Sequence, residues 1–174
     1  MARVPFVPVD LSEPADVVDA MRARRNGKLN EVDRVLLHSP DFARGFNLLM
    51  GNVRHKLKIS PFLRELAICG VGYLNDSDFE VVNHLPELRK LGASETQLNA
   101  LSDFEAAAVN EQLFDENQRL IMRLTIEMTK GVKVSDETFA KLRRLFPCSQ
   151  DIVEFVGTIA SYNMAARMLV ALGV

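Results

Sequence analysis

The chain has no tryptophan and only two cysteines, Cys69 and Cys148, which lie far apart in apolar surroundings. Cysteines in such surroundings are typical of small core residues, so the sequence predicts neither a disulfide framework nor a thiol-based metal site. Neither one belongs to a Cys-x-x-Cys pair. The chain also lacks a glycine-rich phosphate loop, a haem motif and a nucleotide-binding fingerprint, so we expect no cofactor.

Neither sign of charge dominates, because 21 basic and 23 acidic residues give a formal net charge of −2. Such a chain exerts no long-range attraction on nucleic acid, and we expect no nucleic-acid partner. No stretch approaches the run of about 18 apolar residues that suggests a membrane span. Residues 1–8 contain no signal-peptide core and are interrupted by prolines, so we expect a cytoplasmic protein without a membrane partner.

Helical signals cover almost the whole chain after an expected extended arm at residues 1–11. Capping residues, N-terminal prolines and terminal glycines predict helices over about 12–26, 30–37, 39–50, 60–74, 77–91, 115–130, 135–146 and 149–172, with a short helix from 94. Residues 102–114 are ambiguous between helix and loop. No alternating apolar pattern is long enough for a strand. The sequence therefore predicts an all-α fold, a compact multi-helix bundle, as a single domain over residues 12–174.

Three acid–base residues stand out on two of the predicted helices. Glu80 and His84 are four residues apart, so they share one helix face. Glu65 precedes nine residues without a charge, in a helix that should be buried on most sides. An unpaired buried carboxylate is costly, so Glu65 needs a partner or a function. Two carboxylates and an imidazole in an apolar interior are suited to moving protons.

A structural reading competes with this interpretation. Ser77 and Glu80 have the spacing of a capping box, in which each side chain bonds the other residue's backbone amide. That arrangement would account for Glu80 without any chemistry. Gly70 and Gly72 are expected to permit close packing of the Glu65 helix, at a cost in helix propensity.

Residues 59–68 and 74–84 together resemble the carboxymuconolactone decarboxylase and alkylhydroperoxidase D-like superfamily. Residues 38–40 and 92–98 are similar to its upstream helix start and its following glycine-led turn, and the resemblance extends over about 36–172. It implies an all-α fold of the alkylhydroperoxidase D-like type. It also implies a homo-oligomer, a dimer, trimer or hexamer, with a small-molecule substrate.

Redox members of that superfamily carry Cys-x-x-Cys-x-x-x-His after a helix that bears a glutamate. By position, the glutamate matches Glu65 and the histidine matches His84, whereas the two cysteine positions are Ser77 and Glu80. A thiolate is the nucleophile in peroxide reduction, so we expect no thiol peroxidase activity. The pattern is similar to the cysteine-less branch, nearer to the lactone decarboxylases, although Val81 stands where that branch often has tryptophan.

The resemblance and the residues together predict proton-transfer chemistry without a cofactor on a small carbonyl compound, for example decarboxylation of a lactone acid. Such an enzyme would be a carboxy-lyase or an isomerase. We assign His84 as general acid or base, Glu80 as the group that orients it, Glu65 as a second acid or base, and Ser77 as a hydrogen-bond donor to the substrate. One alternative is a divalent metal held by Glu65, Glu80 and His84. Another is a non-catalytic oligomeric binding or scaffold protein.

Four further residues are open to two interpretations. An acidic substrate needs a cation, for which Arg64 and Arg89 are candidates, although both suit a solvated surface. Tyr162 and Asn163 are polar residues in an apolar part of the last predicted helix. They would either line a pocket or be satisfied by hydrogen bonds within the core.

Overall fold

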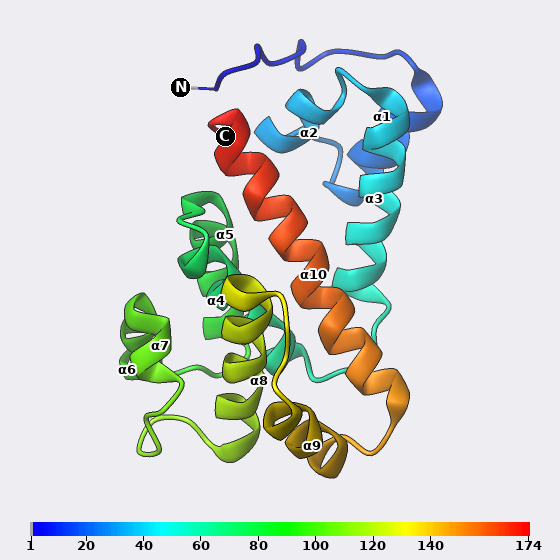
Figure 1. Ribbon diagram of the computed structural model, residues 1–174. Helices are drawn as coiled ribbons and strands as arrows, with labels where there is room; N and C mark the ends of the chain where they lie inside the picture. Colours follow the sequence, from blue (N-terminus) through cyan, green and yellow to red (C-terminus); the bar gives the residue numbers. More distant parts are fainter. Residues whose placement is uncertain (1) are drawn as a thin grey trace. The chain divides into compact units, whose positions relative to one another are not determined.

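The computed structural model describes residues 2–174, which form helices joined by short loops and contain no β-strand (Figure 1). The predicted all-α fold is confirmed. The helices are α1 (Ala15–Arg24), α2 (Glu31–Leu36), α3 (Pro40–His55), α4 (Pro61–Leu74), α5 (Asp78–Lys90), α6 (Glu95–Ala100), α7 (Phe104–Ala107), α8 (Glu116–Ile126), α9 (Asp136–Leu145) and α10 (Ser149–Leu172). Two short elements complete them, the 3-10 turn η1 (Leu101–Asp103) and the π-helical turn η2 (Glu127–Gly131).

The chain divides into two compact units. The first comprises the residues up to Leu57 together with Ala171–Val174, and the second comprises Lys58–Val170. The sequence pattern predicted one domain over residues 12–174 and did not indicate this division. All of the acid–base residues singled out above belong to the second unit.

In the first unit, residues 2–11 form no helix and are held by hydrogen bonds. The Arg3 amide donates to the Leu172 carbonyl at 2.7 Å, and the Val7 amide donates to the Arg34 carbonyl at 3.2 Å. Asp33, on α2, is fully buried and forms ion pairs with Arg24 and Arg25. A buried carboxylate is tolerated when it is paired in this way.

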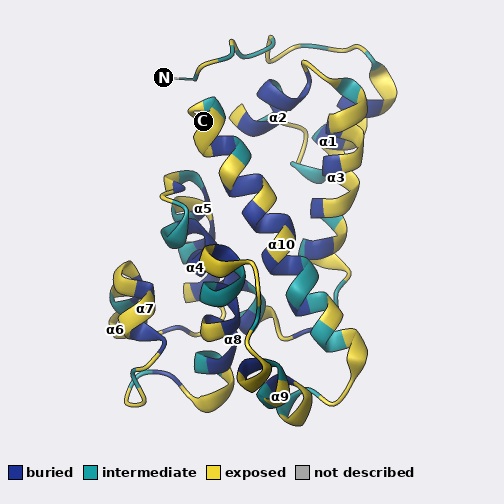
Figure 2. Ribbon diagram, in the orientation of Figure 1, coloured by how far each residue is buried: buried dark blue, intermediate teal, exposed yellow. Residues whose placement is uncertain are grey.

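The core of the second unit is built around α4, which packs against α5 and α8. Figure 2 shows how much of α4 is buried. A Cβ atom on Gly70 would lie 2.1 Å from the nearest ring atom of Phe104, and one on Gly72 would lie 3.0 Å from Cγ2 of Val81. The two glycines therefore permit close approach to α4, as the sequence indicated.

Two helix ends differ from the prediction. α3 extends to His55, beyond the expected end near residue 50. The helix from Asp115 ends its α-helical part at Ile126 and continues as the π-helical turn η2. There Asn163 donates to the Thr129 hydroxyl at 2.9 Å and Arg167 donates to the Thr129 carbonyl at 3.0 Å. These partners come from α10, so the change of helix type accompanies tertiary contacts that no local pattern predicts.

By length and composition, α10 is apolar enough to cross a membrane, with a mean hydropathy of 1.3 in its most apolar window. The sequence inspection for long apolar runs did not single out this helix. Half of that window is buried inside the protein, as in the core helix of a soluble protein. Burial of that half accounts for part of the apolar composition of α10.

Candidate active site

The turn between α4 and α5 determines how the acid–base residues meet. Asp76 adopts a left-handed backbone with φ of 53°. Its amide donates to the Tyr73 carbonyl, and the Ser77 amide donates to the Gly72 carbonyl at 2.9 Å. This pair of bonds is the Schellman motif that closes α4. The motif folds α5 back along α4.

The Schellman motif also rules out the predicted capping box. The Ser77 amide is already bonded to Gly72, and the Ser77 side chain makes no bond to the first turn of α5. The capping-box prediction is therefore wrong. The hydroxyl oxygen of Ser77 is buried without a hydrogen-bond partner, and Glu80 is free to face another group.

Glu65, Glu80 and His84 converge between α4 and α5, and each is nearly inaccessible to solvent. Glu65 and Glu80 are each 4% exposed and His84 is 2% exposed. Nδ1 of His84 lies 2.6 Å from Oε2 of Glu65, and Nε2 lies 3.4 Å from Oε2 of Glu80. The imidazole therefore bridges two carboxylates, with a short bond to one and a longer contact to the other.

Arg64 completes the cluster. Its Nε and Nη2 atoms each lie 3.4 Å from Oε1 of Glu65, the oxygen that does not face His84. The four groups form a chain in the order Arg64, Glu65, His84 and Glu80. If the imidazole is protonated, their two positive and two negative charges cancel, which is how buried ions are tolerated.

Burial of His84 opposes protonation and by itself would lower the pKa of the imidazole. The hydrogen bonds and negative charges of Glu65 and Glu80 outweigh burial, so the pKa of His84 is raised above its ordinary value of 6.5. The imidazolium is thus favoured near neutral pH. In this state His84 can donate a proton, and Glu65 is the partner placed to receive one.

Two more side chains border the cluster. The Tyr162 ring, on α10, meets the His84 ring edge-on with centroids 5.1 Å apart, which fixes the plane of the imidazole. Cys69 is fully buried one helical turn after Glu65. Burial raises the pKa of its thiol far above the ordinary range, and the charges of Glu65 and Glu80 raise it further. Cys69 is therefore an inert thiol and not a replacement for the missing cysteine pair.

Residues 40–112 match the carboxymuconolactone decarboxylase family. This match and the shared all-α fold support the resemblance to the carboxymuconolactone decarboxylase and AhpD-like superfamily. No curated protein matches the sequence.

Solved structures share the fold of this chain. An AhpD-core, peroxidase-related protein from Ralstonia eutropha JMP134 superposes with a TM-score of 0.79 at 20% identity, covering 99% of this chain and 90% of that one. A peroxidase-related protein from Silicibacter sp. TM1040 gives 0.77 at 16% identity, covering 99% and 88%. A variant of the debrominase Bmp8 in complex with 2,3,4-tribromopyrrole gives 0.76 at 14% identity, covering 99% and 92%. At these identities the likeness shows the fold alone.

The structure brings the predicted site residues together in part. Glu65, Glu80 and His84 meet as one cluster. Ser77 lies three residues before Glu80, but its hydroxyl makes no hydrogen bond to the cluster. The sequence did not predict the edge contact between Tyr162 and His84, because α10 is remote in sequence from α5. The position of Cys69 beside the cluster could have been predicted, since Cys69 lies four residues after Glu65 and so on the same helix face.

Asn163 is a satisfied core residue. Its side chain accepts a hydrogen bond from Asn75 at 3.1 Å and donates to Thr129 and to the Ile159 carbonyl. It therefore connects the end of α4 to η2 and does not line a pocket.

Within the described residues 2–174, no group of three or more His, Cys, Asp and Glu side chains is arranged to hold a metal ion. In the cluster, both imidazole nitrogens of His84 face carboxylate oxygens, at 2.6 and 3.4 Å. The cluster is thus organised by ion pairs and hydrogen bonds.

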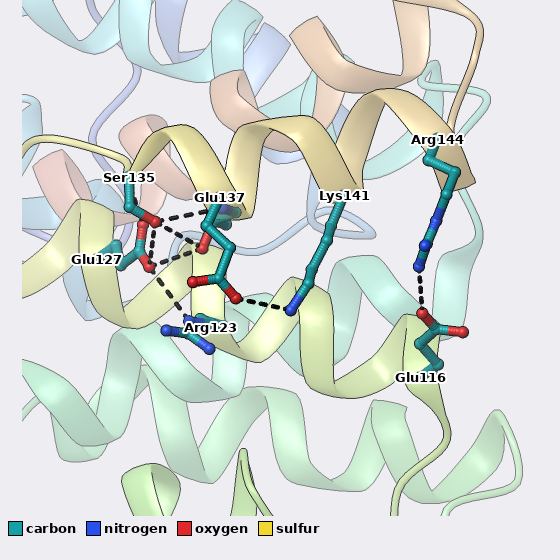
Figure 3. A network of polar contacts seen from close by, with 8 residues as sticks. Glu116, Arg123, Glu127, Ser135, Glu137, Lys141 and Arg144 are labelled. Carbon is teal, nitrogen blue, oxygen red and sulfur yellow. Dashed lines mark hydrogen bonds and ion pairs between the residues drawn. The ribbon is translucent and has the colours of Figure 1, made fainter.

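A separate surface cavity of about 350 Å³ lies among α8, α9 and the segment after α7. None of the cluster residues lines it; its walls are Ala108, Val109, Glu111, Glu116, Arg119, Leu120, Arg123, Lys141 and Leu145. Its cations are already paired with carboxylates, as Figure 3 shows for Lys141 with Glu137 and for Arg123 with Glu127. The charges around this cavity balance, and the pair of Arg144 with Glu116 connects α9 to α8 (Figure 3).

Proposed function

We propose that this protein catalyses proton transfer on a small carbonyl compound, such as a lactone acid, with its own side chains supplying the proton. The observation that carries the proposal is the 2.6 Å bond between Glu65 and His84 inside a buried cluster. The thiol alternative has no support, because the cysteine positions of the redox motif are Ser77 and Glu80 and the nearby Cys69 is inert.

The geometry favours a division of labour that differs from the sequence-based assignment. Glu65 holds Nδ1 of His84 by the short bond and so orients the ring, a role that the sequence had suggested for Glu80. The longer contact of 3.4 Å to Glu80 supplies a second counter-charge for the imidazolium. Glu65 and His84 therefore act as one acid–base pair that shares a proton.

The reaction that such a pair supports can be written with balanced charge. In a decarboxylation, the bond between the α-carbon and the carboxylate breaks, carbon dioxide leaves, and the electron pair remains as an enolate. The acid–base pair then donates one proton to the carbon and recovers it from water. In an isomerisation, the pair removes a proton beside the carbonyl and returns it at another carbon.

The proposal is tested by incubating the protein in D₂O with 5-oxotetrahydrofuran-3-carboxylate, a γ-lactone acid. Deuterium incorporation at the carbon beside the carbonyl is followed by proton NMR, and no carbon dioxide is expected because the carboxylate of this probe is not on that carbon. We expect wild-type exchange above the buffer rate and a fall of about 100-fold or more in His84→Gln. Cys69→Ala should retain the rate. Equal rates for wild type, His84→Gln and buffer would overturn the proposal for this substrate class.

The burial of the cluster favours a second candidate function, an oligomeric binding or scaffold protein in which the ion pairs are purely structural. Glu65, Glu80 and His84 are each at most 4% exposed. This candidate predicts no exchange and a large loss of stability when the cluster is broken. The exchange assay separates the two functions directly.

We also infer that the protein forms a homo-oligomer. Val153, Ala160 and Met164 are exposed on α10 and share one helix face by their spacing of seven and four residues. An exposed apolar face of this kind is typical of a subunit contact. Light scattering coupled to size-exclusion chromatography gives the test, and a monomer at micromolar concentration would contradict the inference.

A further inference from the structure

Arg64 differs from the other arginine that the sequence offered as a substrate contact. The Arg64 side chain is 13% exposed and lies against Glu65 in the acid–base cluster. The Arg89 side chain is 52% exposed and forms a close ion pair with Glu95, its Nε lying 2.6 Å from that carboxylate. Only Arg64 therefore combines a largely buried cation with contact to the proposed acid–base pair.

The pairing of Arg64 with Glu65 leaves much of the guanidinium unused. Both contacts go to the same oxygen at 3.4 Å, whereas charge-assisted N–H···O⁻ bonds usually measure about 2.7–2.9 Å. Within the described residues 2–174, Nη1 of Arg64 makes no hydrogen bond, and it is not among the buried atoms that lack a partner. Nη1 therefore faces solvent on the outer side of the cluster.

Arg64 is also the most accessible member of the chain of four groups. The side chains of Glu65, Glu80 and His84 are 6%, 5% and 3% exposed, against 13% for Arg64. A ligand that approaches the cluster thus meets the guanidinium first and Oε1 of Glu65 next. A planar guanidinium with a free edge matches a carboxylate by two parallel hydrogen bonds.

We propose that Arg64 binds a carboxylate of the substrate and is the residue that selects acids over neutral carbonyl compounds. This inference rests on the proposed acid–base function of the Glu65–His84 pair. When a ligand carboxylate takes the free edge of Arg64, the guanidinium neutralises the ligand and Glu65 keeps the His84 imidazolium as its counter-charge, so that one net negative charge remains, on Glu80. The ligand then lies beside Oε1 of Glu65, through which the proton is exchanged.

The bound carboxylate is one that the reaction retains. A guanidinium stabilises the negative charge of a carboxylate, whereas decarboxylation removes that charge, so an anchored group is not the one that leaves. A decarboxylated substrate therefore carries a second acid group, and a substrate with a single carboxylate undergoes proton transfer alone. The chemical class is a small carbonyl compound with at least one carboxylate that survives the reaction.

The test compares two probes that differ in one carboxylate. 5-Oxotetrahydrofuran-3-carboxylate and the neutral γ-butyrolactone are each titrated into nitrogen-15-labelled protein, and dissociation constants are obtained from NMR shifts of the Arg64 Nε–H and the His84 ring. We expect wild type to prefer the lactone acid by about tenfold or more. Arg64→Gln should lose this preference, and Arg64→Lys should keep part of it because the charge remains.

Arg89→Gln is the matched control and should retain the wild-type preference, because Arg89 is exposed and paired outside the cluster. The ratio of two affinities within one variant does not depend on how stable that variant is. Equal binding of both probes by wild type, or an undiminished preference in Arg64→Gln, would overturn the role of Arg64. Binding is measured without turnover, so the two proposals can fail separately. If deuterium exchange is observed but the lactone acid is not preferred, the proposed function stands and only the role of Arg64 is overturned.

Discussion

Replacing His84 with glutamine tests the charge balance of the cluster. The imidazolium sits between two carboxylates at 2.6 and 3.4 Å, and all three side chains are at most 6% exposed. Without it, Arg64 remains as the single cation beside two buried carboxylates. Removing one partner of a buried ion pair typically costs about 3–5 kcal/mol. We expect His84→Gln to lose about that much of the free energy of unfolding near neutral pH.

The loss should depend on pH in a defined direction. The pKa of His84 is raised from 6.5, so its stabilisation is complete below about pH 6.5 and is lost as the pH rises through the folded-state value. The difference between wild type and variant should therefore be largest at about pH 6.5 and shrink as the pH rises through the folded-state pKa of His84.

Urea unfolding followed by far-UV circular dichroism at several pH values measures this difference. His38→Gln is the control, since His38 is exposed and its ring bonds the Pro5 carbonyl, so it should change stability by less than about 1 kcal/mol. The double variant Glu80→Gln with His84→Gln leaves one balanced pair and should recover part of the loss. A deficit below about 1 kcal/mol without pH dependence would refute the coupled-ion description.

Three further predictions concern the surroundings of the cluster. Gly70→Ala, whose Cβ would lie 2.1 Å from a buried phenylalanine ring, should destabilise the protein by about 1–3 kcal/mol in thermal unfolding, whereas Gly157→Ala, with no atom within 4 Å, should be neutral or stabilising. Glu127→Gln should lower the free energy of unfolding by about 1–3 kcal/mol, because hydrogen bonds from the start of α9 outweigh the desolvation of this carboxylate and lower its pKa. This loss should fade as the pH falls below about 4.5, and a loss that persists in acid would contradict this origin. In native protein, Ellman's reagent should modify the exposed Cys148 and spare the buried Cys69, so that rapid reaction of both thiols would show the core to be open.

Local sequence patterns predicted most of the helices for identifiable reasons. Ser60 accepts from the Leu63 amide and Pro61 occupies the first helical position of α4, as their order indicated. Ser94 and Gln97 form the reciprocal capping box expected at the start of α6. Such signals concern residues within one helical turn, so they are independent of the remainder of the fold.

The ambiguous stretch at residues 102–114 had no comparable local signal. It contains the end of η1, the short helix α7 and a loop, and Phe104 inserts its ring against Gly70 of α4. The π-helical turn after α8 is similarly tied to Asn163 and Arg167. In both cases the backbone conformation accompanies partners that are distant in sequence.

The sequence by itself determined that this protein is helical, that Glu80 and His84 share a helix face, and that the thiols of a redox motif are missing, since these follow from spacing and residue type. Only the tertiary structure decided that Glu65 reaches His84 and that Ser77 caps nothing. The physical reason is the turn at Asp76, whose left-handed backbone commits the Ser77 amide to Gly72. That commitment turns α5 along α4 and leaves Glu80 to pair with the imidazole.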